Sequence, residues 1–212
     1  MNHAIVHCRT PWSALVACLI AMVLAHSSFA TTIATVDIAR MLSESELVFE
    51  GTVLEARAQV SAKSGWIHTF ITFEIKEVIK GKFRRNRLTL RFAGGTVGDR
   101  SFKAHGLVMP QVGEHGVYFV ETLSRQQVNP LFGWTQGHFL VNEDEEGNEI
   151  VQTRSRRNVT DMSFETKVEK MTVSTGTAAG VSTARRAERQ PGLTKRAFIS
   201  RLRERTRAQV DQ

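Results

Sequence analysis

Cysteine is scarce in this chain of 212 residues, and the position of the two cysteines matters more than their number. Both Cys8 and Cys18 lie within the first thirty residues, so the segment from Thr31 to Gln212 contains no thiol. This excludes a disulfide framework, a cysteine nucleophile and cysteine-ligated zinc in that segment. A domain of this size without disulfides must be stabilised by its hydrophobic core, and about 180 residues suffice for one.

Long apolar runs are also rare. The one run of this kind extends from Trp12 to Ala25, follows Arg9 and precedes small residues at Ser28 and Ala30. A basic start, a short apolar stretch and a small-residue ending are typical of a secretory signal peptide. The run is shorter than the roughly 20 residues that span a bilayer. We therefore expect residues 1–30 to be cleaved near Ala30, leaving an exported periplasmic or secreted chain with no transmembrane segment; a retained helix is the alternative.

Net charge is low in most of the mature chain. Residues 31–153 contain 13 basic and 15 acidic residues, a net charge of −2, whereas residues 154–212 contain 14 and 6, a net charge of +8. The basic character of the protein therefore belongs to its C-terminal part. Nucleic-acid binding by the main domain is not indicated, because such domains carry a basic patch of their own.

Alternating apolar and polar residues predict three consecutive strands. Leu54, Ala56, Ala58 and Val60 alternate with polar residues, and residues 61–65 form a hairpin turn before the next alternating stretch at 67–76. A third alternation covers residues 87–92, so the three strands form an antiparallel meander. A short helix capped by Thr35 precedes them, with one apolar face made of Ile38, Met41 and Leu42.

Three shorter strands are predicted at residues 116–120, near Phe139 and near Ile150. The first is apolar on both faces, as expected of a strand covered on both sides. Many short strands without a long internal helix predict an all-β domain, and we expect residues 31–153 to form a small OB-like Greek-key barrel. A small β-sandwich is the alternative.

The C-terminal part is predicted to consist of a linker and a helix. Residues 154–192 are small, polar and basic without an apolar period, which predicts a flexible linker. Residues 193–210 predict a basic amphipathic helix with Thr194 as N-cap and Leu193 and Phe198 as a hydrophobic staple. Its stripe of Phe198, Ile199 and Leu202 either docks on the barrel, which we favour, or folds on an anionic surface. In the second case the contacts are Arg201, Arg203 and Arg205.

Several short stretches together carry a family resemblance. The stretches SELVFEGTV, EVIKG, AGGTVGDRSF, VGEHGVYFV and TQGHFLV, in this order, resemble a group of uncharacterised exported bacterial proteins. The resemblance covers residues 35–151 and implies no particular activity. The start of the domain is also similar to netrin-like and tissue-inhibitor-of-metalloproteinase modules, which implies a curved OB barrel. Those inhibitors use an N-terminal cysteine that the mature chain lacks, so their mechanism does not carry over.

No residue of the mature chain is predicted to be catalytic or to bind a cofactor or metal. Gly94, Gly95 and Gly98 follow a strand, but neither the lysine nor the helix of a nucleotide-binding loop comes after them. The sequence therefore predicts that these glycines form a turn. The histidines, His68, His105, His115 and His138, fall in separate segments without the close spacing of metal ligands.

One pair of aromatic residues remains as a possible contact with a ligand or a partner. Phe132 and Trp134 lie in a loop with proline and glycine, where they contact a ligand or a partner or plug one end of the barrel. The acidic stretch at 142–148 lacks the register of a calcium loop and reads as a solvated hairpin tip. We therefore expect a non-enzymatic module that binds a protein or an envelope component. The alternatives are a small hydrolase or metal-dependent enzyme, and an oligonucleotide-binding OB domain.

Overall fold

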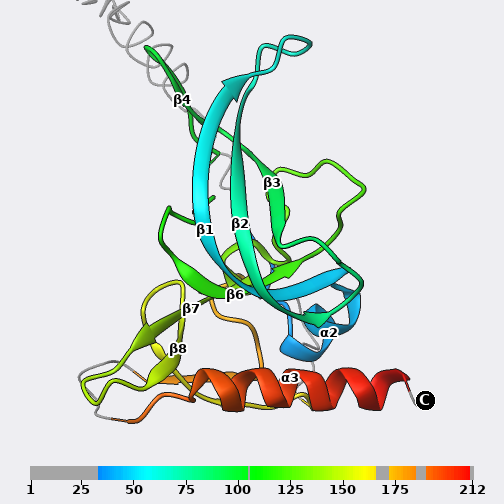
Figure 1. Cartoon of the computed structure of the whole chain (residues 1–212), viewed down its shortest axis with the longest axis vertical. Helices are drawn as coiled ribbons and strands as arrows, with labels where there is room; N and C mark the ends of the chain where they lie inside the picture. The colour runs from blue at the N-terminus through cyan, green and yellow to red at the C-terminus, as the bar shows by residue number, and fades with distance from the viewer. Residues whose placement is uncertain (1–32, 105, 166–171, 185–189, 211–212) are drawn as a thin grey trace, which may run out of the picture. The chain divides into compact units, whose positions relative to one another are not determined.

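The computed structural model describes residues 33–104, 106–165, 172–184 and 190–210 (Figure 1). The predicted signal peptide, residues 1–30, lies outside these residues. None of the helices within the described residues has the length and apolar character needed to cross a membrane.

The fold is mainly β, as predicted, and its centre is one antiparallel sheet of eight strands. The strands are ordered β10-β9-β8-β7-β6-β1-β2-β3 across the sheet, so chain neighbours pair except where β6 joins β1. The strands are β1 (Leu47–Val60), β2 (Ile67–Lys80), β3 (Arg87–Ala93), β6 (His115–Val120), β7 (His138–Glu143), β8 (Glu149–Thr153), β9 (Asn158–Met162) and β10 (Val181–Ala184).

The sheet does not close into a barrel, which corrects the expectation of an OB-like Greek key. Within the described residues β3 pairs only with β2, and β10 pairs only with β9, so the sheet has two edges. A closed barrel would require the strand at the β3 edge to pair with the strand at the opposite edge of the sheet. Instead the chain after β3 forms a separate small ladder of β4 (Gly95–Val97) and β5 (Arg100–Phe102), with Gly98 at positive φ in its turn.

The predicted meander of β1, β2 and β3 is confirmed by the strand register. Figure 1 shows β1 and β2 as a long curved hairpin that rises away from β6, β7 and β8. The predicted buried face of β1 is wrong in part, because Leu54 is an extra residue at a β-bulge between Val53 and Glu55. Leu54 is exposed, and the buried positions of β1 are mainly those before the bulge.

Strand β6 separates two hydrophobic clusters, which explains why its residues are apolar on both faces. Val117 and Phe119 belong to a cluster that lies against the helices, whereas Tyr118 and Val120 belong to a second cluster under the β1–β2 hairpin. Successive side chains of a strand point to opposite faces, so one strand contributes to both clusters. This prediction is confirmed, since all four side chains are fully buried.

Helix α2 (Ile38–Glu44) is the short helix that was predicted. Its apolar face of Ile38, Met41 and Leu42 is completely buried. Asp37 rather than Thr35 caps the helix, since the Asp37 carboxylate accepts a hydrogen bond from the backbone N–H of Arg40 at 2.6 Å.

The prediction of a linker over residues 154–192 is corrected by β9 and β10, which continue the sheet within that range. Leu193, at the start of the next predicted segment, lies between β8 and β9 and forms backbone hydrogen bonds with both strands. Its backbone N–H donates to the Val159 carbonyl, and its own carbonyl accepts from the Val151 N–H. The C-terminal segment is therefore built into the sheet.

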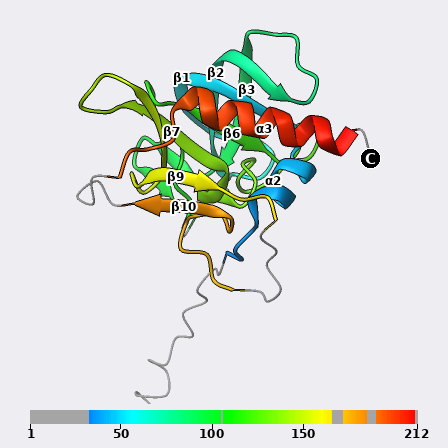
Figure 2. The ribbon, with the colours of Figure 1, turned by 90° about the horizontal axis from the view of Figure 1, so that it is seen from below.

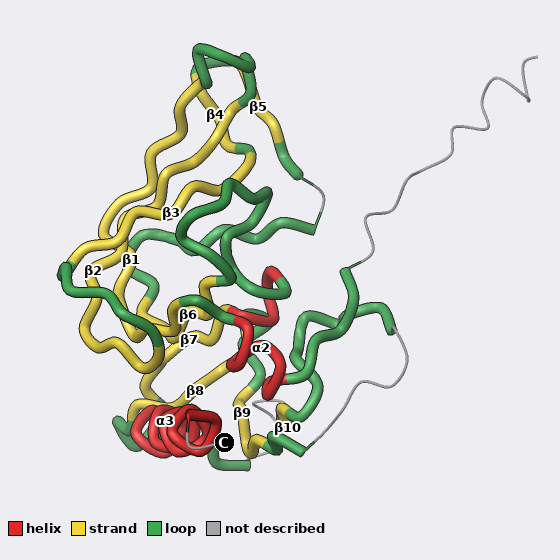
Figure 3. The backbone as a smooth tube through the Cα atoms, turned by 90° about the vertical axis from the view of Figure 1, so that its right-hand side faces the viewer, coloured by secondary structure: helices red, strands yellow, loops and turns green. Residues whose placement is uncertain are grey.

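Helix α3 (Lys195–Val210) docks on the domain through the predicted stripe. Phe198 and Leu202 are fully buried, and the Phe198 ring lies 5.0 Å from the ring of Phe139. Thr194 caps the helix, as predicted, by accepting a hydrogen bond from the N–H of Ala197. Figure 2 shows α3 beside β9, and Figure 3 shows it at the β8 and β9 end of the sheet, far from β4 and β5.

Candidate functional site

A polar groove of about 970 Å³ lies where the β7–β8 hairpin, the start of β9 and the segment before α3 meet. Gly192 packs closely on β8, because a Cβ at that position would lie 3.1 Å from the Cβ of Ile150, which is tighter than an ordinary van der Waals contact. We call this feature the amide groove. Its lining residues are Asn142, Glu143, Asp144, Glu145, Glu146, Ile150, Gln152, Arg156, Asn158, Gln190, Pro191 and Gly192.

A chain of side-chain amides crosses three strands in this groove. The Asn142 amide nitrogen donates to the Gln152 side-chain oxygen at 3.0 Å, and the Gln152 nitrogen donates to the Asn158 oxygen at 2.8 Å. Gln152 is buried, so its hydrogen bonds fix its rotamer. Each amide has two N–H donors and one oxygen acceptor with two lone pairs. These hydrogen bonds therefore leave part of that capacity for a ligand.

The rim of the groove is acidic. Glu143, Asp144, Glu145 and Glu146 come from the β7–β8 hairpin, and among the described lining residues Arg156 is the one basic side chain. The Asp144 carboxylate accepts hydrogen bonds from the N–H groups of Asn148 and Glu146, so it stabilises its own turn. The Asn148 bond contributes most to holding the pKa of Asp144 below its usual value. The groove thus favours neutral or cationic ligands over anions.

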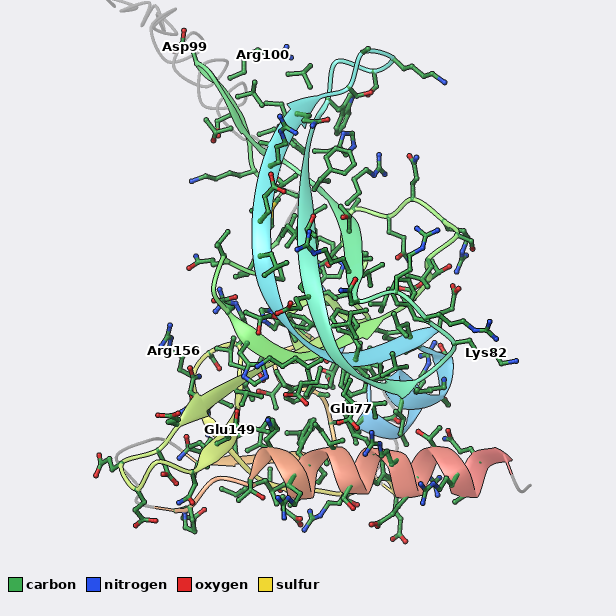
Figure 4. The ribbon with its side chains drawn as sticks, in the orientation of Figure 1. Glu77, Lys82, Asp99, Arg100, Glu149 and Arg156 are labelled. Carbon is green, nitrogen blue, oxygen red and sulfur yellow. The ribbon has the colours of Figure 1, made fainter. Side chains whose placement is uncertain are left out.

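An ionic network joins the sheet to the first turn of α3 beside the groove. Glu50 is 5% exposed; its carboxylate lies 2.8 Å from His115 Nε2 and 3.1 Å from Lys195 Nζ. Glu149 completes the network, 2.6 Å from the same Lys195 nitrogen, and is labelled near the start of α3 in Figure 4. The His115 hydrogen bond lowers the pKa of Glu50; burial opposes this shift and Lys195 adds to it. The network therefore connects α3 to the sheet, and its two carboxylates, Glu50 and Glu149, are both paired with Lys195.

We expect the substitution Lys195→Met to lower the free energy of unfolding by about 1 kcal/mol at neutral pH, since Glu50 then keeps only His115. A carboxylate with a depressed pKa stabilises the fold above its usual pKa and loses this contribution as the pH falls through its folded pKa. The variant should therefore begin to unfold at a higher pH in an acid titration followed by circular dichroism. Lys63→Met, at an exposed turn position, is the control; equal curves for both variants would contradict the expectation.

A second group of polar side chains surrounds the buried His138. The His138 ring is tilted over the Tyr118 ring at 4.8 Å, and its Nε2 lies 3.8 Å from a Glu114 carboxylate oxygen. Arg154 lies 3.0 Å from the other Glu114 oxygen. Neither ring nitrogen of His138 has a hydrogen-bond partner within the described residues. Burial, with a smaller effect of Arg154, lowers the pKa of His138 to about 3, so this histidine is neutral at physiological pH.

The structure separates the sequence-predicted contact residues from the amide groove. Phe132 is 8% exposed and belongs to the cluster under the helices, and Trp134 is half-buried with a φ of 61°. Neither residue lines the amide groove. Because the sheet is open, there is no closed barrel for them to plug.

Two of the three arginines predicted for an anionic surface form ion pairs within the domain. Arg201 pairs with Asp161 on β9, and Arg203 pairs with Glu77 on β2. The Nε atom of Arg205 is buried without a hydrogen-bond partner within the described residues. These contacts hold α3 against the sheet, so binding of the helix to an anionic surface stays a prediction.

The histidines do not form a metal site within the described residues. His68 lies on β2, His115 on β6 and His138 on β7, and His105 lies outside the described residues. No group of three His, Cys, Asp or Glu side chains in the described part of the chain is placed to hold a metal ion.

Comparisons with known proteins found no family model that matches this chain, and no curated protein or solved structure that is significantly similar to it. The resemblance to exported bacterial proteins and to netrin-like modules therefore stays a prediction from the residues.

Proposed function

We propose that this protein is an exported, non-enzymatic binding module that recognises a protein or a cell-envelope component through the amide groove. The observation that carries the proposal is the hydrogen-bonded chain of Asn142, Gln152 and Asn158 on one face of the sheet. Its proposed export rests on the signal-like residues 1–30.

The chemistry of the groove favours a ligand rich in hydroxyl groups. A hydroxyl both donates and accepts, which matches amides that offer both kinds of group. The acidic rim accepts hydrogen bonds from hydroxyls and attracts amines, and it disfavours phosphates and other anions. A neutral or amine-bearing glycan of the envelope therefore fits best, and a protein segment with similar groups fits the same chemistry. Oligonucleotides, the second alternative from the sequence, fit poorly.

The groove gives less support to a hydrolase. Its described lining residues include no histidine, serine, threonine, cysteine or lysine to act as nucleophile or base. The pKa of the Asp144 carboxylate is shifted downward, whereas a general acid requires an upward shift. The neighbouring His115 is bound to Glu50 and lies in a network of paired charges.

Calorimetric titration with a neutral amino-sugar oligomer, tetra-N-acetylchitotetraose, tests the proposal. Asn142→Ala should weaken binding about fivefold, since one hydrogen bond of about 1 kcal/mol is lost from an exposed residue. Asn86→Ala is the matched control, because it removes an exposed amide from the turn before β3, and its affinity should equal that of the parent. Absence of binding by the parent, or equal weakening in both variants, would contradict the proposal. Tight binding of spermidine alone would shift the ligand class to amines.

A further inference from the structure

The edge of the sheet at β3 is strongly basic. Residues 82–91 contain five basic residues and no acidic one. Four of the five are exposed and Arg91 is half-buried. Within the described residues none of these five forms an ion pair with a carboxylate. Lys82 is labelled at the outer end of this segment in Figure 4. The five residues are Lys82, Arg84, Arg85, Arg87 and Arg91.

The backbone of this edge is available for pairing. The N–H of Gly94 points toward β2 and donates to the Ile67 carbonyl. The N–H of Ala93 points away from β2 and donates to the Val128 carbonyl at 2.8 Å. N–H and C=O groups alternate in direction along a strand, so those of Arg87, Thr89 and Arg91 point in the same outward direction as those of Ala93. No backbone hydrogen bond occupies these three residues on that side within the described chain.

The side chains of the strand define what a paired segment must carry. Arg87, Thr89 and Arg91 lie on the outer face, and the Thr89 hydroxyl lies 2.9 Å from that of Thr72. Leu88 and Leu90 are buried in the cluster under the hairpin on the other face. Because cross-strand neighbours on one face interact directly, a matching strand places carboxylates beside the arginines and apolar residues beside the leucines.

We propose that the β3 edge binds an extended acidic segment of a partner protein, in which carboxylate and apolar residues alternate, as an added strand. The hydrogen bond from the Ala93 N–H to the Val128 carbonyl is a bond of this kind, formed within the chain itself. Main-chain hydrogen bonds supply the attachment and the arginines supply the selection for acid. This surface lies at the opposite edge of the sheet from β9 and β10, so the proposal does not depend on the function proposed for the amide groove.

The test uses the full mature chain and a peptide of seven residues, the length of β3, with alternating valine and glutamate. Titration followed by amide NMR should shift the N–H signals of Arg87, Thr89 and Arg91. Thr89→Pro removes an outward N–H without removing a bond to β2, so binding should weaken about tenfold. Thr89→Ala is the matched control, because both variants lose the Thr72 contact, and it should bind like the parent. Circular dichroism establishes that both variants fold.

The remaining outcomes separate this proposal from its competitors. Replacement of Arg87 and Arg91 by glutamine should weaken binding about threefold for each charge, and a peptide with lysine in place of glutamate should not bind. Single-stranded DNA or the peptide could instead bind with an affinity that depends on the arginines and is unchanged by Thr89→Pro. That result would show a general anion site and overturn the proposal. Absence of peptide binding at millimolar concentration would also overturn it, and would assign the arginines to protecting the edge against aggregation.

Discussion

Replacement of Phe198 by alanine is expected to lower the free energy of unfolding by about 4 kcal/mol. Phe198 is fully buried, contacts the Phe139 ring and belongs to the cluster between α3 and the sheet. Its removal leaves a cavity that Phe139 and Leu202 cannot fill without distorting β7 or α3. Urea unfolding of residues 31–212, followed by circular dichroism, measures the loss as a shift of the midpoint.

The control for this experiment is Arg196→Ala, which lies on the exposed side of the same helix. We expect this variant to stay within about 0.5 kcal/mol of the parent. Similar small losses for both variants would mean that α3 is not docked in solution. In that case the helix would be free for the anionic surface that its arginines also fit.

The buried His138 is expected to make the fold sensitive to mild acid. Burial lowers its folded pKa to about 3, whereas the unfolded chain takes up the proton near the usual value of about 6.5. Protonation therefore favours the unfolded chain as soon as the pH falls below that usual value, and stability declines down to the folded pKa. The loss attributable to His138 is about 2 kcal/mol at pH 5.

The variant His138→Phe isolates this contribution. Phenylalanine keeps an aromatic ring over Tyr118 and cannot titrate, and the histidine nitrogens make no hydrogen bond to the described part of the chain that would be lost. The difference in unfolding free energy between pH 7.5 and pH 5 should therefore be about 2 kcal/mol smaller in the variant than in the parent. Comparison of this difference removes any constant cost of the larger ring. Parallel pH profiles for the two proteins would show that His138 is protonated in the folded state.

Local patterns predicted the strands well because alternation reports directly on burial. Leu88, Leu90 and Phe92 alternate as predicted and are buried in the observed β3. The bulge at Leu54 was not predicted. The extra residue is defined by the register with β2, and the alternation of apolar and polar residues in the sequence continues through it. Sequence periodicity thus located β1 but misplaced part of its buried face.

The architecture was harder to predict than its elements. The pairing of β1 with β6 joins residues far apart in the chain, and no local pattern specifies it. Strands β9 and β10 were missed because a short strand near an edge needs few apolar residues: Val159 and Met162 are the buried hydrophobic side chains of β9. Their burial depends on α3 and on the chain before α2, which the composition of residues 154–192 does not reveal.

The candidate site illustrates the same limit. The acidic hairpin was correctly located by its composition, but the amide groove depends on Gln152 being buried beside Asn142 and Asn158. The available signal was one polar residue in each of the apolar strands β7 and β8, together with Asn158 at the start of β9. It gains meaning only when the register places the three amides on one face.

The most direct test of the proposed binding function observes the amide groove itself. The side-chain NH₂ signals of Asn142, Gln152 and Asn158 are separate from the backbone signals in an NMR spectrum of nitrogen-labelled protein comprising residues 31–212. Titration with tetra-N-acetylchitotetraose should shift these three pairs of signals together, in proportion to occupancy, and leave the side-chain signal of Asn86 unchanged. Unchanged groove signals at millimolar ligand, or shifts confined to other parts of the sheet, would contradict binding in the amide groove.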